Sequence, residues 1–134
     1  VATTYMNMGV VYQKLGDYEK ALLHQQKALD IYLKTVGPLH GSVAATYKNM
    51  GVVEDKLGNF EKALELYQKA LEIELKCFGG SHATVATTYM NMGVVYEKLG
   101  DYEKALLHQQ IDLVPRTALA EHVFLQAQRE AVPL

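Results

Sequence analysis

Asn7, Asn49 and Asn91 stand at equal spacings of 42 residues in this chain of 134 residues. A side-chain amide can both donate and accept hydrogen bonds, so a row of amides can bind the backbone of an extended peptide. Alternatively, the same side chains coat the surface and brace neighbouring parts of the chain. The choice depends on the elements that position them.

The five histidines and the single cysteine are the residue types used in metal binding and nucleophilic catalysis. His24 and His108 occupy the same place in a repeating pattern, as do His40 and His82, which is typical of structural residues. No His-Glu-x-x-His pair occurs, and Cys77 has no second ligand at the spacing of a zinc site. Phosphate loops, nucleophile motifs and paired acids are also missing. We therefore predict no catalysis, no metal and no cofactor.

Composition excludes several classes of partner. The chain is 49% hydrophobic, and 13 basic against 15 acidic residues give a net charge of −2, unlike the basic face that nucleic acid requires. No apolar run approaches the roughly 20 residues of a membrane span. The lone Cys77 forms no internal disulfide, so we expect a reducing, cytoplasmic setting. The sequence begins at Val1 without an initiator Met or a signal-peptide pattern. We interpret this as a start within a longer array of repeats.

The sequence repeats with a period of 42 residues. Val1–Gln26 matches Val85–Gln110 at 25 of 26 positions, and Val1–Ser42 matches Val43–Thr84 at 25 of 42. Such even copying indicates stacked units that bury the same faces, not one pocket of distinct residues. We divide the chain into three repeats and a divergent tail: 1–42, 43–84, 85–114 and 115–134.

Each repeat contains two helical patterns whose apolar residues recur at spacings of three and four. In the first repeat, the first helix carries Tyr5, Met8, Gly9, Tyr12 and Leu15. The second helix carries Tyr18, Ala21, Leu22, Gln25, Ala28, Leu29 and Leu33. Neither helix pair can cover its own apolar stripe, so the pairs must stack into an all-α solenoid.

Glycine and capping residues separate the helices. Gly16 can adopt the left-handed conformation that ends a helix, and Asp17 can cap the next one. Gly58-Asn59 and Gly100-Asp101 repeat this device, so we expect a turn in every repeat. The second helices should end near Gly37-Pro38 and Gly79-Gly80.

Two further expectations concern small and polar residues. Glycines lie mid-helix, where each costs about 1 kcal/mol relative to alanine, which suggests close packing. They are Gly9, Gly51 and Gly93, and we expect them to face Ala21, Ala63 and Ala105. Before the second and third repeats, we expect Ser42 or Thr84 to cap the following helix in place of His40 and His82.

The repeats resemble the tetratricopeptide repeat. The first repeat carries the signature at Tyr5, Met8, Gly9, Tyr12, Ala21 and Ala28. The second carries it at Tyr47, Met50, Gly51, Ala63, Tyr67 and Ala70, with Glu54 where an aromatic is usual. The third carries it at Tyr89, Met92, Gly93, Tyr96 and Ala105. The period of 42, rather than the usual 34, resembles the repeats of kinesin light chain.

That resemblance implies a right-handed α-solenoid in which the first helix of each pair lines a concave surface for an extended peptide. We predict these peptide-binding residues: Met6, Asn7, Val10, Lys14, Lys48, Asn49, Val52, Lys56, Met90, Asn91, Val94 and Lys98. The asparagines would orient the peptide, and adaptable Met and Val side chains would give apolar contact.

This sequence differs from the peptide-binding grooves of related proteins, and the differences limit which classes of partner we expect. Tetratricopeptide cochaperones clamp a terminal carboxylate with paired Asn and basic residues. Here valines occupy the expected Asn positions: Val10, Val52 and Val94. Lys48 alone is available as a basic partner, so chaperone-tail capture is not expected. Met6 and Met90 also replace a second Asn of the kinesin-light-chain groove.

The tail departs from the repeats after Gln110. Pro115 should end or kink the third repeat's second helix, and Thr117 could cap a helix from Ala118 to about Ala131. We favour a capping helix over the last repeat. A vector-derived or unrelated terminus remains an alternative, because Leu113-Val114-Pro115-Arg116 resembles a thrombin-type cleavage site. A third alternative is insertion into a neighbouring molecule's groove.

Taken together, the residues favour a non-catalytic adaptor for a protein or peptide partner, without nucleic acid or membrane. The alternative is an architectural module that self-associates by end-to-end stacking or tail exchange. Because the first and third repeats are nearly identical, exposed repeat ends could form a homo-oligomer.

Overall fold

The computed structural model describes the backbone of residues 1–110 and the side chains of residues 1–101, and this part of the chain is helical throughout, without a strand. The helices are α1 (Ala2–Lys14), α2 (Tyr18–Thr35), α3 (Gly41–Lys56), α4 (Phe60–Phe78) and α5 (Ala83–Gln110). The predicted all-α fold is confirmed. Residues 1–98 form one compact unit and residues 99–134 another. The stacking described below lies within the first unit.

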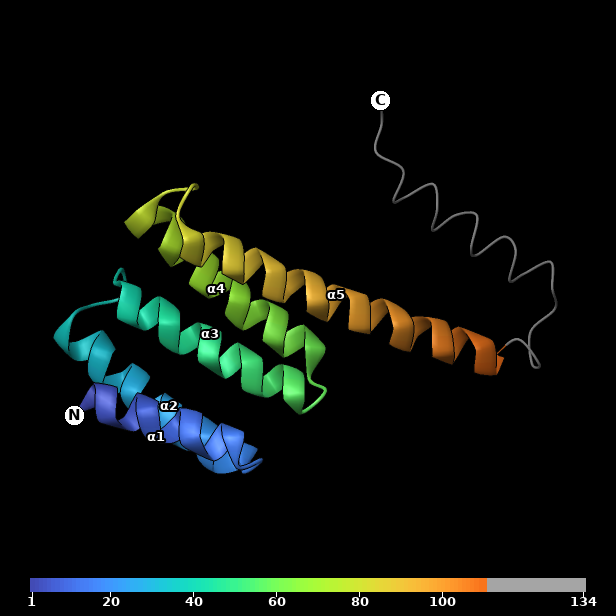
Figure 1. The fold of residues 1–134 in the computed structure, drawn as a ribbon, viewed down its shortest axis with the longest axis horizontal. Coiled ribbons are helices and arrows are strands. Elements are labelled where there is room, and N and C mark those ends of the chain that lie inside the picture. Colours follow the sequence, from blue (N-terminus) through green and yellow to red (C-terminus); the bar gives the residue numbers. More distant parts are fainter. Residues whose placement is uncertain (111–134) are drawn as a thin grey trace. The chain divides into compact units, whose positions relative to one another are not determined.

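Successive helices pack as antiparallel pairs that stack on one another. α1 packs on α2 and α3 packs on α4, while α3 also contacts both helices of the preceding pair. Figure 1 shows α3 lying between the α1–α2 pair and α4. This order gives the solenoid that the repeat predicts, because each pair covers an apolar face of its neighbour.

Local signals end the helices where the sequence indicates. Gly16 and Gly58 adopt φ of 81° and 82°, the left-handed conformation that a Cβ would strain. The Asp17 carboxylate accepts a hydrogen bond from the Lys20 N–H at 3.3 Å, as a cap should. Before α3, however, the cap is His40, whose Nδ1 accepts from the Ser42 N–H at 3.0 Å. The expected Ser42 cap is therefore wrong.

Two apolar clusters form the core. Val43 and Ala44 of α3 pack with Ala28 and Leu29 of α2, which joins the first two repeats. The second cluster joins α4 to α5 and contains Ala63, Tyr67, Leu71, Val85, Met92 and Val95. The same position of each first helix, Val43 or Val85, is thus buried against the preceding pair.

The mid-helix glycines admit close packing, but their neighbours differ from those expected. A Cβ on Gly9 would lie 2.6 Å from Cγ of Gln25 and 3.1 Å from the carbonyl oxygen of Ala21. A Cβ on Gly51 would lie 2.7 Å from Cε1 of Tyr67, and no atom of Ala63 is among its nearest neighbours. The expected alanine contact is therefore wrong at Gly51, because the larger side chain four residues later fills the space.

The predicted turn at Gly100-Asp101 is not formed, because α5 runs unbroken from Ala83 to Gln110. In α2 the corresponding helix continues beyond Gln26 and buries Ala28, Leu29 and Tyr32. The match to the first repeat stops at Gln110, so a returning helix here would lack those core residues. Continuing α5 keeps its backbone hydrogen bonds instead. The expected tail helix and the boundary at residue 115 lie outside the described residues.

Candidate peptide-binding surface

Helical spacing gives α3 two opposite sides. Lys48, Val52 and Lys56 recur at four-residue intervals on one side, whereas Tyr47 and Glu54 lie on the other. Neighbouring first helices are also joined directly to one another. Thr46 Oγ1 donates to Met6 Sδ at 3.6 Å, and Lys98 binds Asp55 across α3 and α5. We call the predicted residues on α1, α3 and α5 the first-helix surface.

The three asparagines remain available for a ligand. Asn7 is exposed, while Asn49 and Asn91 are half-buried. Among residues 1–101, other side chains of the first helices, such as Lys48 and Lys98, form hydrogen bonds. The three Asn amides form none with these residues. Each amide therefore keeps both its donor and its acceptor groups for a bound backbone.

The Lys48 side chain contacts the second helix of its own repeat and the first helix of the next repeat, so it is not free. Its Nζ donates to Glu74 Oε2 at 3.1 Å and to the carbonyl oxygen of Thr84 at 3.2 Å. Glu74 is buried, and its other oxygen accepts a hydrogen bond from Thr88. The ion pair joins α3, α4 and α5, so the Lys48 ammonium supports the surface without being free for a ligand.

The first repeat has uncharged residues at the positions that correspond to Lys48 and Glu74. One repeat earlier, Met6 and Tyr32 replace Lys48 and Glu74, and the Tyr32 hydroxyl shares a hydrogen bond with Thr3 at 2.9 Å. These contacts between helices were not expected from the sequence. The joint replacement of Met by Lys and of Tyr by Glu between repeats is the signal that could have found them.

The other lysines of the first-helix surface differ in their partners. Lys98 Nζ lies 3.0 Å from Asp55 Oδ1 and 3.1 Å from Oδ2, which fixes α5 against α3. Lys14 and Lys56 are exposed and form none of the ion pairs found among residues 1–101. Free positive charge on this surface therefore comes from these two residues.

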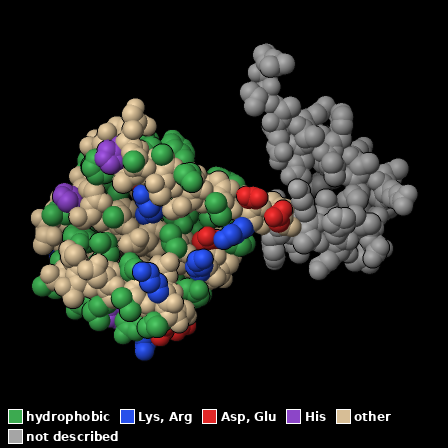
Figure 2. Space-filling view, viewed as in Figure 1, with side chains coloured by type: hydrophobic (Ala, Val, Ile, Leu, Met, Phe, Trp, Pro, Cys, Tyr) green, Lys and Arg blue, Asp and Glu red, His purple; other side chains and the backbone are tan. Residues whose placement is uncertain are grey.

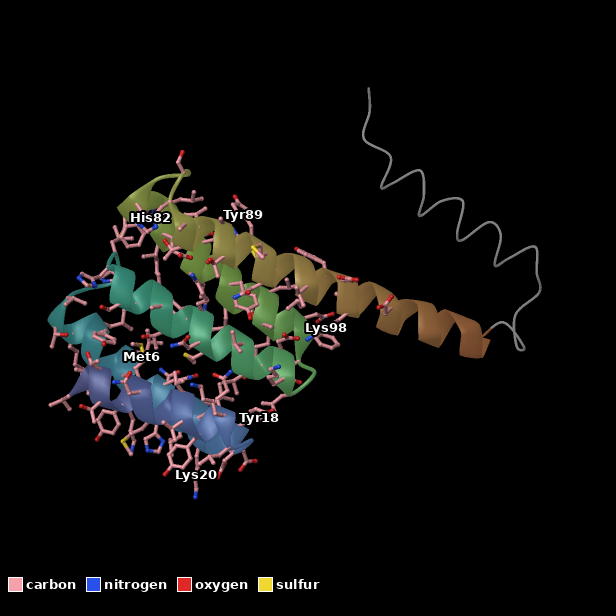
Figure 3. The ribbon with its side chains drawn as sticks, viewed as in Figure 1. Met6, Tyr18, Lys20, His82, Tyr89 and Lys98 are labelled. Atoms are coloured by element: carbon pink, nitrogen blue, oxygen red, sulfur yellow. The ribbon has the colours of Figure 1, made fainter. Side chains whose placement is uncertain are left out.

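The apolar members of the surface become more exposed along the array. Met6 and Val52 are half-buried and pack against the two core clusters. Val10 is also half-buried, whereas Met90 and Val94 on α5 are exposed. Figure 3 labels Met6 and Lys98, which mark the surface on its first and last helices. Contact with apolar ligand groups is thus available mainly at its α5 end.

A second hollow lies on the other side of α3 and was not expected from the sequence. It is an open hollow of about 650 Å³ between α2, α3 and α4, and its lining includes Leu22, Leu29, Met50 and Leu66. Lysines of α4 line the edge of this hollow and give it positive charge. Lys69 Nζ lies 5.6 Å from the ring centroid of Tyr47. We call this hollow the outer pocket, and it is the alternative to the first-helix surface as a site for a bound peptide.

Glu54, which departs from the usual aromatic, is stabilised locally. Its buried carboxylate accepts from Asn59 Nδ2 at 2.8 Å and lies 3.7 Å from Lys62 Nζ. Asn59 makes no capping hydrogen bond with its side chain, and its Nδ2 instead donates to Glu54. Nearby, burial and then the charge of Asp55 raise the pKa of Tyr67 from 10.0 to about 12.

The described part of the chain offers few features for binding a metal, a membrane or a nucleic acid. Across those residues, no three His, Cys, Asp or Glu side chains gather as metal ligands would. None of the helices described there is long and apolar enough to cross a membrane. On the face in Figure 2, basic side chains lie as separate spots among hydrophobic and uncharged atoms.

Comparison with known proteins agrees with the repeat pattern. The family model described as tetratricopeptide repeat matches residues 1–76 and 56–110. The crystal structure of BtubC (BKLC) from P. vanneervenii superposes with a TM-score of 0.70 at 25% identity, covering 100% of this chain and 50% of that one. The chain thus spans about half the length of that protein. No curated protein matches. The chain belongs to the tetratricopeptide repeat family, with repeats of the kinesin-light-chain-like type.

Proposed function

We propose that this chain is a non-catalytic adaptor that binds an extended segment of a partner protein on its first-helix surface. The family is typically a protein-interaction scaffold, which supports the general role. The observation that carries the specific proposal is the row of Asn7, Asn49 and Asn91, whose amides make no hydrogen bond within residues 1–101 while their neighbours do.

The surface favours a partner of definite chemistry. Lys14 and Lys56 supply unpaired positive charge, and exposed Met90 and Val94 supply apolar contact. An unfolded segment with apolar side chains and one or more acidic residues matches both features. The asparagines would bind its backbone, so they would fix its direction without requiring one particular sequence.

A displayed library of short unstructured peptides, screened against the full chain, tests this proposal. We expect saturable binding of selected peptides. Asn49→Ala should weaken it by about tenfold, because roughly 1 to 1.5 kcal/mol of hydrogen bonding is lost. Gln68→Ala, which removes an exposed amide from α4, is the matched control and should bind normally. A screen that yields no saturable peptide, or peptides indifferent to Asn49→Ala, would contradict the proposal.

A second candidate is self-association, which one observation favours. Val1 and Val11 of α1 are exposed, whereas Val43, Val53, Val85 and Val95, at equivalent positions of α3 and α5, are buried. The exposed stripe on α1 is thus shaped for another helix pair. Stacking through this stripe joins unlike surfaces and would build assemblies larger than a dimer.

Sedimentation of the full chain distinguishes this candidate. Stacking predicts an average mass that keeps rising with concentration, and Val11→Glu should abolish the rise because a charge cannot be buried there without a partner. A constant monomer mass would refute stacking while leaving peptide binding unaffected.

A further inference from the structure

The outer pocket extends along most of α2. Its lining on that helix runs from Glu19 to Leu33, a rise of about 21 Å at roughly 1.5 Å per residue. Leu22 and Leu29 lie on this lining, and the side chains of Leu23 and Leu33 are exposed at its edge. The pocket is therefore an elongated apolar groove, with the length of about four turns of helix.

The polar side chains on this lining are largely engaged with one another. The amide of Gln26 donates to Asp30 Oδ1 at 3.0 Å. The carboxylate of Glu54 accepts from Asn59 and lies 3.7 Å from Lys62 Nζ. An extended segment would leave the backbone groups that face this lining without partners, whereas a helix pairs its own N–H and C=O groups. The groove therefore favours a helical ligand, in contrast to the asparagine row of the first-helix surface.

The two long edges of the groove carry opposite charges. Glu19 is exposed on the α2 edge. On the α4 edge, the Lys62 side chain is 64% exposed although it lies near Glu54, and Lys69 forms none of the ion pairs found among residues 1–101. Lys62 and Lys69 are two turns apart, so they lie on one side of α4 with about 10 Å between them along the axis. Acidic side chains seven residues apart on a ligand helix would meet both lysines.

We propose that the outer pocket binds an amphipathic helix of a partner protein. Leucine-like side chains on one stripe of that helix enter the groove, and two acidic residues seven positions apart at the edge of the stripe pair with Lys62 and Lys69. The chain's own tail has Glu121 and Glu130 nine positions apart, which does not match this spacing. The pocket lies on the other side of α3 from the asparagine row, so this binding does not depend on the proposed function.

A displayed library of peptides of about 14 residues, with leucines fixed at helical spacing and screened against the full chain, tests the proposal. We expect the selected peptides to carry Asp or Glu at two positions seven apart and to become helical on binding, as circular dichroism reports. Lys69→Glu should weaken their binding by about tenfold, because an attractive charge pair becomes a repulsive one. Replacing one of the two acids of the peptide by lysine should restore binding to Lys69→Glu.

Lys27→Glu is the matched control. Lys27 occupies the same position one repeat earlier, and its Nζ likewise lies 5.6 Å from the ring centroid of a tyrosine, Tyr5. Lys27 is not on the pocket lining, so this variant should bind the selected peptides normally. Asn49→Ala should also bind them normally, which separates the outer pocket from the first-helix surface.

Four results would overturn the proposal. The screen could yield no saturable peptide. Selected peptides could lack the paired acids, or bind Lys69→Glu as well as Lys27→Glu. The bound peptides could remain without helical structure, which would assign an extended ligand to the pocket. The unaltered chain could form an oligomer that the peptides dissociate, which would assign the pocket to a second copy.

Discussion

Lys48 and Glu74 take the positions in the second junction that Met6 and Tyr32 occupy in the first. The charged version is nearly enclosed, with the Lys48 and Glu74 side chains 15% and 2% exposed. A buried ion pair gives little net stability compared with apolar residues, yet removing one partner strands the other charge. Each residue of the pair is therefore intolerant of change by itself.

Replacing Lys48 alone should be costly. We expect Lys48→Met to lower the free energy of unfolding by about 3 kcal/mol, because Glu74 would stay buried without its cation. The double variant Lys48→Met with Glu74→Tyr recreates the first junction and should recover most of that loss. Urea unfolding of the unaltered chain, the two single variants Lys48→Met and Glu74→Tyr, and the double variant measures the coupling. Simple additivity of the two single changes would contradict the assigned ion pair.

Tyr67 should make stability depend on pH in the alkaline range. Burial, followed by the charge of Asp55, raises its pKa to about 12 from 10.0, so the folded state holds the phenolic proton more tightly than the unfolded state. The resulting stabilisation is complete below pH 10.0 and is lost as pH rises towards about 12. Unfolding measured across that window should show the loss, and Tyr67→Phe should reduce it. An equal pH dependence in both proteins would contradict the assignment.

At the scale of helices, each first helix has two apolar faces with different partners. Val43 and Ala44 of α3 pack in the cluster that contains Ala28 and Leu29 of the preceding pair, while Gly51 faces its own second helix through Tyr67. Among the described residues, no helix pair precedes α1, so α1 lacks the first kind of cover. Apolar side chains that are buried on α3 are therefore exposed on α1, as Val1 and Val11 illustrate.

The two kinds of glycine environment predict opposite responses to alanine. Gly51→Ala should destabilise the fold by about 1 to 3 kcal/mol, because its Cβ would lie 2.7 Å from the ring of Tyr67. Gly93→Ala should instead stabilise α5 by roughly 0.5 to 1 kcal/mol, because its Cβ meets open space and alanine favours a helix.

Thermal unfolding at low protein concentration compares these two variants while the chain is monomeric. Equal destabilisation by both substitutions would show that Gly93 is packed like Gly51 and would contradict this prediction.

For the whole molecule, the sequence predicted features that local residues determine. The 42-residue period, the left-handed Gly16 and the Asp17 cap all depend on a few neighbouring positions. The path of α5 could not be predicted that way. Its local turn signal at Gly100 equals that of Gly16, and the difference arises from core residues that the tail lacks.

The site was predictable to a similar degree. The repeat predicted the asparagines in a row, but nothing in it indicated an outer pocket between α2 and α4. The ion pair of Lys48 with Glu74 was indicated only by the joint replacement of Met by Lys and of Tyr by Glu between repeats. Both features depend on contacts between helices that are distant in the chain. The first-helix surface as a peptide site remains a prediction about the assembled array.

Site-specific photo-crosslinking tests that prediction most directly. A photoreactive phenylalanine derivative at Asn7 reports on the first-helix surface, and the same group at Gln26, an exposed residue lining the outer pocket, reports on the other side. With a library-selected peptide, we expect crosslinking from position 7 and none from position 26. Crosslinking from position 26 alone would contradict the account and place the ligand in the outer pocket.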